Sequence, residues 1–204
     1  MLSRNQIIIK IFHCIYSSYI KNDYSNIDFN NSFNDYKNLY LKVLEILIYI
    51  KKRAEFEINH GLKKKFASEY DLNPNKKFIK NFILKKIETD INKNYEDDEK
   101  KSIAKKIFES LKTKNYFINY MADENNELNS DKLLINKIIK NEIFNYTELF
   151  DYLENKSIYW NDDILAVQIL TLKIVDEYQI TKKLFLIILI FLKILKMKNL
   201  QKIY

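Results

Sequence analysis

The stretch SFNDYKNLYLKVLEILIYIKKRAEFEINHGLKKK, from Ser32 to Lys65, decides the fold of this chain. Its apolar residues recur in alternating steps of four and three, as in the seam of a coiled coil, at Tyr36, Tyr40, Val43, Leu47, Ile50 and Ala54. Leu41, Leu44 and Ile48 widen that seam, so several neighbouring elements are needed to cover it. The pattern predicts one long helix at the centre of a bundle, with Ser32 and Asp35 capping its start and Gly61 marking a weakening or its end.

Glycine and proline are almost absent from the chain. The 204 residues include one Gly and one Pro, whereas sheets and α/β units usually need such residues between strands. We therefore predict an all-α fold, a helical bundle with loops of Asn, Asp, Ser and Lys. Asn73-Pro74 predicts a loop. A helix is expected after it, with a buried side made of Phe78, Phe82, Ile83, Ile87 and Ile91.

Later helix starts are indicated by acids and short polar side chains. Asp97, Asp98 and Glu99 lie where negative charge stabilises the first turn of a helix, and we interpret them in this way and not as a metal site. Asn161 is predicted to cap the last helix. Trp160, directly before it, is interpreted as a core anchor in preference to a stacking platform for nucleic acid.

The chain as a whole is basic, with a net charge of +7 and a pI near 9.1, which suggests nucleic acid or an anionic membrane as a partner. Lys, Asn, Ile, Tyr and Phe dominate, however, and these residues have AT-rich codons, so compositional drift would make any helical protein basic. The position of charge therefore counts for more than its amount. The single Cys14 excludes an intramolecular disulfide framework, and we expect no signal peptide, which favours the cytoplasm.

A first helix is predicted from Ser3 to about Lys21. Ser3 and Gln6 fit a capping box, and Leu2 and Ile7 fit a hydrophobic staple. We expect neighbouring helices to cover a wide apolar face made of Ile7, Ile8, Ile11, Phe12, Ile15, Tyr19 and Ile20. The opposite face carries Gln6, Lys10, His13, Ser17 and Lys21. From the residues alone, that face is either an ordinary solvated surface or a cationic strip for a partner.

Three separated stretches resemble the transcription antitermination factor NusB. The opening MLSRNQIIIKIFHCIYSSY is similar to the start of that family, where a basic segment runs into a helix ending in a Leu-Tyr or similar pair, here Ile15-Tyr16. EYDLNPNKKFIKN (Glu69 to Asn81) and LENKSIYWNDDI (Leu153 to Ile164) resemble the long amino-terminal half of the NusB form of Bacteroidetes-type bacteria. The stretches follow the family's order and are spread over most of Met1 to Tyr178, so the resemblance implies a NusB-like bundle.

This resemblance implies RNA binding in transcription. NusB pairs with the ribosomal protein in the NusE role, and together they hold the boxA element of nascent ribosomal RNA in an antitermination complex with RNA polymerase. Arg4 and Lys10 match the first and the later basic position of the family opening, and each would contact phosphate. Asn5, which completes the implied RNA-contact set, and Ile8 stand where family members usually have Arg. Two lost charges predict weaker RNA binding with a smaller salt dependence.

A second hypothesis is a helical protein-interaction module, or an eroded family remnant that does not bind RNA. Neither hypothesis involves catalysis, a cofactor or a metal. One Gly excludes a Walker loop and a dinucleotide fingerprint, and one Cys with two His cannot form a common zinc site. Glu57-x-x-His60 has the spacing of a di-iron helix motif, but such a site needs a second copy, and Lys10 stands where the partner of His13 would be.

The chain changes character after Glu177, which divides it into a helical region, residues 1–178, and an atypical apolar and basic tail, residues 179–204. From Leu184 to Leu195 every residue except Lys193 is apolar, but this run is shorter than the roughly 20 residues that cross a bilayer. NusB relatives continue instead into a second amphipathic half. We expect that this chain lacks much of that half because it leaves the ancestral reading frame just after Phe185.

Overall fold

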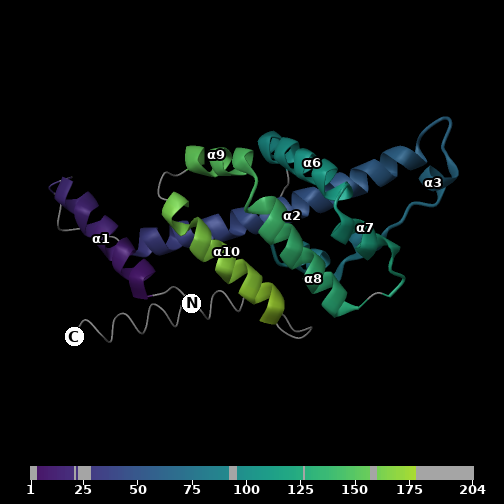
Figure 1. Cartoon of the computed structure of the whole chain (residues 1–204). Helices are drawn as coiled ribbons and strands as arrows, with labels where there is room; N and C mark the ends of the chain where they lie inside the picture. Colours follow the sequence, from purple (N-terminus) through teal and green to yellow (C-terminus); the bar gives the residue numbers. More distant parts are fainter. Residues whose placement is uncertain are drawn as a thin grey trace.

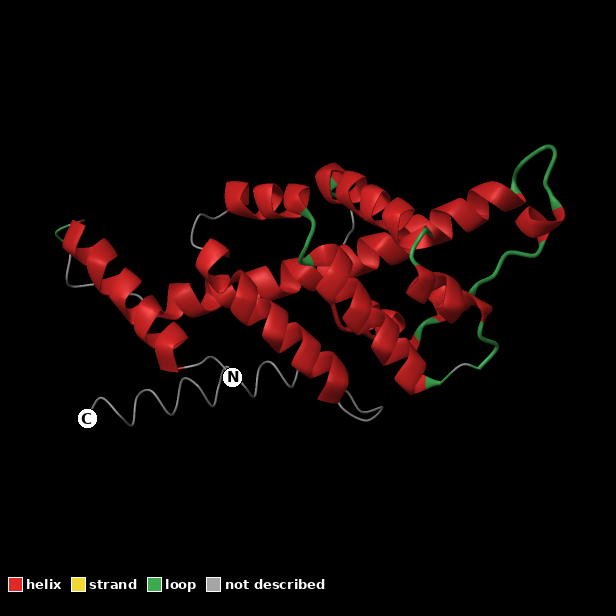
Figure 2. Cartoon of the chain, viewed as in Figure 1, coloured by secondary structure: helices red, strands yellow, loops and turns green. Residues whose placement is uncertain are grey.

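The computed structural model describes residues 4–20, 22, 29–91, 96–125, 127–156 and 160–177. Within these ranges the chain is built from helices and contains no strand (Figure 2), so the all-α prediction is confirmed. The elements are α1 (Arg4–Ile20), α2 (Phe29–Leu62), α3 (Glu69–Leu72), α4 (Lys77–Lys80), α5 (Phe82–Ile91), α6 (Asp98–Lys112), α7 (Asn115–Ala122), α8 (Leu128–Ile138), the π-helical turn η1 (Ile139–Ile143), α9 (Thr147–Lys156) and α10 (Trp160–Glu177).

Helix α2 is the central element of the bundle. It crosses the molecule from the end near α1 to the end near α3 (Figure 1), and α5, α6 and α10 pack directly on it. Every residue of the predicted seam is buried, and Leu44 and Ile48 are buried beside it, while Leu41 is half-buried. The seam predicted from its periodicity is therefore confirmed.

The predicted start of this helix is wrong. Helix α2 begins at Phe29, so Ser32 lies inside it and is not its N-cap. Extending an existing helix by a few residues is cheap compared with nucleating it, so the residues before Ser32 join the rod. At the other end α2 stops at Leu62, one residue after Gly61, as the glycine indicated.

The helix predicted after the Asn73-Pro74 loop is divided in two. Helices α4 and α5 are separated at Asn81, whose side-chain oxygen accepts a hydrogen bond from the Leu84 backbone N–H at 3.1 Å. This contact starts a new helix at Phe82 and turns the following residues relative to α4. As a result Phe78, Ile83 and Ile87 are buried as expected, whereas Phe82 is 36% exposed and its predicted burial is wrong.

The later helix starts are predicted in part. Asp97 is the N-cap of α6, where its side chain accepts the Lys100 backbone N–H at 3.1 Å, as its acidity predicted. Helix α10 begins at Trp160, so Asn161 lies inside it and the predicted cap is wrong. Trp160 is buried, which confirms it as a core anchor. The tail, residues 179–204, and Tyr178 before it lie outside the described residues.

Candidate functional site

Helix α1 carries the predicted RNA-contact residues at one end of the molecule. It contacts α2 and projects beyond the other helices (Figure 1). Arg4, Asn5 and Lys10 belong to this helix, but their side chains are outside the described part of the structure. Leu2 and Ser3, of the predicted staple and cap, also lie outside the described residues. The helix predicted from Ser3 to about Lys21 is therefore present as α1.

The apolar face of α1 is not covered as predicted. Phe12 is 62% exposed, and the same face exposes Ile8, Ile15, Tyr19 and Ile20. The reason is that α1 packs substantially on α2 and on no other described element, so no second helix covers this face. Ser18, seven residues after Ile11 and therefore on the same side of the helix, is buried, and Ile11 is half-buried.

A second set of candidate side chains lies at the opposite end of α2. There the chain turns from α2 into α3 through a basic loop that Asp71 holds in place. The Asp71 carboxylate accepts a hydrogen bond from the Lys64 ammonium at 2.8 Å, and it forms a capping box with Ser68, whose hydroxyl accepts the Asp71 backbone N–H at 3.2 Å. A Cβ atom at Gly61 would lie 2.8 Å from the Asp71 Oδ1 atom, so glycine allows this carboxylate to approach α2.

This loop presents cations and aromatic rings to solvent. Lys63 and Lys65 are exposed, and the Lys65 ammonium lies 5.9 Å from the centre of the Phe66 ring. Phe66 is 88% exposed and Tyr70 is 76% exposed. Large aromatic side chains left this open are unusual in a helical bundle, because burying them contributes strongly to stability.

Beside the loop lies a cavity of about 950 Å³, which we call the aromatic hollow. It is bounded by α2, α3, α6 and α7, and its walls include Phe56, His60, Tyr70, Ile118, Arg53 and Lys112. The Phe56 and His60 rings stack with centroids 6.0 Å apart, and the Arg53 guanidinium lies 5.3 Å from the Phe56 ring centre. The hollow therefore combines flat ring surfaces with charged groups, among them the carboxylates of Glu57 and Asp71.

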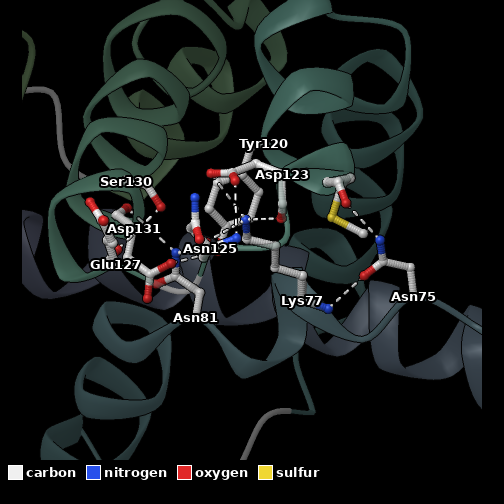
Figure 3. Close-up of polar contacts among 10 residues, drawn as sticks. Asn75, Lys77, Asn81, Tyr120, Asp123, Asn125, Glu127, Ser130 and Asp131 are labelled. Carbon is white, nitrogen blue, oxygen red and sulfur yellow. Dashed lines mark hydrogen bonds and ion pairs between the residues drawn. The ribbon is translucent and has the colours of Figure 1, made fainter.

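A smaller cavity of about 530 Å³, the lysine hollow, adjoins the first and shares Asn75, Met121 and Ala122 with it. Lys76 and Lys80, which line it, are exposed. Lys77, also in its wall, is instead turned into the structure, where its ammonium donates to the Asn125 backbone oxygen at 2.9 Å (Figure 3). The two hollows form one continuous surface.

The floor of this surface is fixed by a polar junction between α5, α7 and α8 (Figure 3). The Asn75 side chain donates to the Met121 backbone oxygen at 2.7 Å. Deeper inside, Asp131 accepts the Tyr120 hydroxyl at 2.6 Å and the Phe82 backbone N–H at 2.7 Å. Burial, together with the Asp131 carboxylate, raises the pKa of Tyr120, so this phenol stays a neutral donor at any physiological pH. The junction is structural and holds the lysine hollow in shape.

The Glu57-x-x-His60 pair does not point to a metal. Glu57 forms ion pairs with Arg53 at 2.9 Å and Lys112 at 3.1 Å, so its charge is already balanced. Within the described ranges, no group of three or more His, Cys, Asp or Glu side chains could hold a metal ion. No helix in those ranges is both long and apolar enough to cross a membrane.

Comparisons with models of protein families, with curated proteins and with solved structures found no match to this chain. The described part of the molecule is thus defined by its own geometry, as a helical bundle with an open amphipathic rod at one end and a basic, aromatic surface at the other.

Reasoning from the sequence missed that second surface. The signal was present in KKKF, residues 63–66, and in the lysines that follow Pro74. Neither segment is remarkable locally, and they are separated along the chain. They form one surface because α3 folds back on α2 and the polar junction holds the segment 75–81 against α7 and α8.

Proposed function

We propose that the protein is an RNA-binding transcription antitermination factor. In this role it binds boxA-like RNA of ribosomal RNA operons in the cytoplasm, together with a NusE-type ribosomal protein, and joins the antitermination complex of RNA polymerase. The resemblance of three ordered stretches to NusB supports this function. The observation that carries it is the position of α1, which projects from the bundle with Arg4, Asn5 and Lys10 on its backbone.

Binding RNA in this way requires cations on an exposed helix. Cations on a rigid helix attract phosphates and release counterions, so RNA affinity must fall as salt rises. A rod that is largely open can also carry two partners, RNA on its polar face and a protein on its apolar face. Because Asn5 and Ile8 replace expected arginines, we expect α1 alone to bind RNA weakly and the ribosomal protein to strengthen the complex.

The second candidate is a helical protein-interaction module without RNA binding. The exposed apolar face of α1, with Ile8, Phe12, Ile15 and Tyr19, favours it, because a continuous apolar strip in water usually marks an interaction surface. In this case α1 would bind a partner helix, and its cations would only keep it in solution.

A filter-binding titration with boxA-like RNA at several salt concentrations separates the two candidates. The R4A/K10A variant should bind more weakly, and its slope of log affinity against log salt should fall by about 1.4, since each phosphate contact to a single strand contributes about 0.7. K105A/K140A is the matched control, because it removes the same charge at two exposed lysines outside both hollows. No RNA binding by the wild type, even with the ribosomal protein present, would contradict the first candidate and leave the second.

A further inference from the structure

The surface made by the two hollows has no role in the function proposed for α1. It lies at the other end of α2, a helix of 34 residues. At 1.5 Å per residue this separates the two ends by about 50 Å. Six exposed side chains make up what we call the basic end. Tyr70 lines the aromatic hollow and Lys76 and Lys80 line the lysine hollow, while Lys63, Lys65 and Phe66 belong to the adjoining loop between α2 and α3.

The charge of the basic end is not balanced by its own acids. Residues 63–80 contain six lysines and two carboxylates. Three of the acids nearby already form ion pairs: Asp71 with Lys64, Glu57 with Arg53 and Lys112, and Asp123 with Lys77. Two further acids, Glu69 and Glu124, are exposed.

In contrast, the four lysines of the basic end form no ion pair with any described residue: Lys63, Lys65, Lys76 and Lys80. Local positive charge of this kind attracts a polyanion.

The aromatic side chains of the basic end specify which polyanion fits. Phe66 and Tyr70 are open to solvent, and Phe56 and His60 offer ring surfaces within the aromatic hollow. An unpaired base has two free faces and stacks on such rings, whereas the bases of a duplex are stacked on each other and cannot. Interleaved rings and cations are therefore the recognition chemistry of a single strand.

The basic end is held to the rest of the bundle by contacts at two points. Asp71 fixes the loop that carries Lys63 and Phe66 through its contacts to Lys64 and Ser68. Asn75 ties the lysine-bearing segment to α7. Binding of an RNA strand here would therefore cost little conformational entropy of the protein.

We propose that the basic end binds single-stranded RNA, by stacking bases on Phe66 and Tyr70 while Lys63, Lys65, Lys76 and Lys80 contact phosphates. This surface is distinct from α1 and does not depend on boxA recognition. Because stacking is tolerant of sequence and the lysines contact only the backbone, binding here should show little sequence preference.

Fluorescence anisotropy with labelled single-stranded oligouridine and oligoadenine 12-mers, and with an RNA duplex of equal length, tests the proposal. We expect the wild type to bind both single strands more tightly than the duplex. The F66L/Y70L variant keeps the apolar character and removes the rings, so it should bind the single strands at least about fivefold more weakly, as the loss of one stacked base predicts. F66W should bind at least as well as the wild type.

The lysines are tested in the same assay. K63A/K65A should lower the slope of log affinity against log salt by about 1.4, whereas the charge-matched K105A/K140A should leave affinity within twofold. All variants change exposed side chains, and an unchanged thermal midpoint verifies that each is folded.

Repeating the assay in the R4A/K10A background separates this proposal from the function of α1. If α1 does not bind RNA, R4A/K10A should have the same RNA affinity as the wild type. F66L/Y70L and K63A/K65A should then lower the affinity as much in the R4A/K10A background as they do in the wild type. Equal RNA affinity of F66L/Y70L and the wild type, or a preference for the duplex, would overturn the proposal. Equal affinity of F66L/Y70L and the wild type would point instead to an acidic protein partner that buries apolar side chains at this surface. For such a partner, leucine can take the place of an aromatic ring.

Discussion

Asp71 shows how one side chain can organise a surface. Hydrogen bonds from Lys64 and from Ser68 lower the pKa of its carboxyl from 3.8 to about 2. A carboxyl whose pKa is lower in the folded than in the unfolded state stabilises the fold at any pH above the unfolded-state pKa. This contribution is lost as the pH falls from about 3.8 through about 2. The contacts of Asp71 should therefore contribute fully to the basic loop at neutral pH.

Lys64→Ala tests this account at the residue scale. Lys64 is the largest cause of the lowered pKa of Asp71, so removing it should return that pKa toward 3.8, as followed by carbon-13 NMR titration of the carboxyl. Lys63→Ala is the matched control and should leave the pKa of Asp71 unchanged, because Lys63 forms no contact with that carboxylate. The same low pKa in Lys64→Ala and the wild type would contradict the assignment.

The sequence could not predict this role for Asp71. It indicated that Gly61 lies near the end of a helix, which is correct, but not why glycine is needed there. The reason is the approach of the Asp71 carboxylate to 2.8 Å from where a Cβ atom would lie. Contacts between residues ten apart depend on how the intervening loop folds, and no local pattern encodes that fold.

At the scale of elements, α1 and α2 illustrate opposite outcomes for similar patterns. Both are amphipathic, and periodicity predicted a covered apolar face for each. The seam of α2 is buried because several helices pack on it. In contrast, α2 is the one described element that packs substantially on α1. Periodicity therefore identifies which residues share a face, and tertiary packing decides whether that face is covered.

This difference predicts unequal costs of truncation. Ile48→Ala removes a side chain with 0% exposure from the centre of α2 and should lower the free energy of unfolding by about 2–5 kcal/mol. Phe12→Ala in α1 should change it by less than about 0.5 kcal/mol, because the ring is mostly in water. Urea unfolding followed by circular dichroism measures both. A cost for Phe12→Ala similar to that of Ile48→Ala would mean that the apolar face of α1 is covered in solution.

At the scale of the whole molecule, one buried ion pair joins the central helix to its neighbours. The Lys100 ammonium of α6 lies 2.7 Å from a carboxylate oxygen of Glu45 in α2, and 3.3 Å from Asp97, which also accepts the hydroxyl of Tyr152 in α9. Burial lowers the pKa of Lys100, but the hydrogen bond and the charge of Glu45 outweigh it and raise that pKa overall. The lysine therefore stays charged in the core.

Lys100→Ala should destabilise the bundle by about 3 kcal/mol, near the lower end of the range for a broken buried pair. Glu45 would lose the ammonium that lies 2.7 Å from it and keep Lys42 at 3.6 Å. The double variant E45L/K100M, which replaces both charges by apolar groups, should recover most of that loss. Chemical denaturation of the wild type, the single variant and the double variant checks this. A double variant less stable than the single would show that the pair contributes net stability beyond its packing.

The sequence by itself determined that the chain is helical, that one long rod lies at its centre, and which residues of that rod are buried. These are properties of spacing and of missing turn residues, which operate over a few helical turns. Only the tertiary structure decided that α1 projects from the bundle and that the lysines near residues 63–65 and 76–80 share one surface. The physical reason is that both depend on contacts between distant segments: α1 packs substantially on α2 and on no other described element, Asp71 holds the loop after α2, and Asn75 ties the segment before α4 to α7.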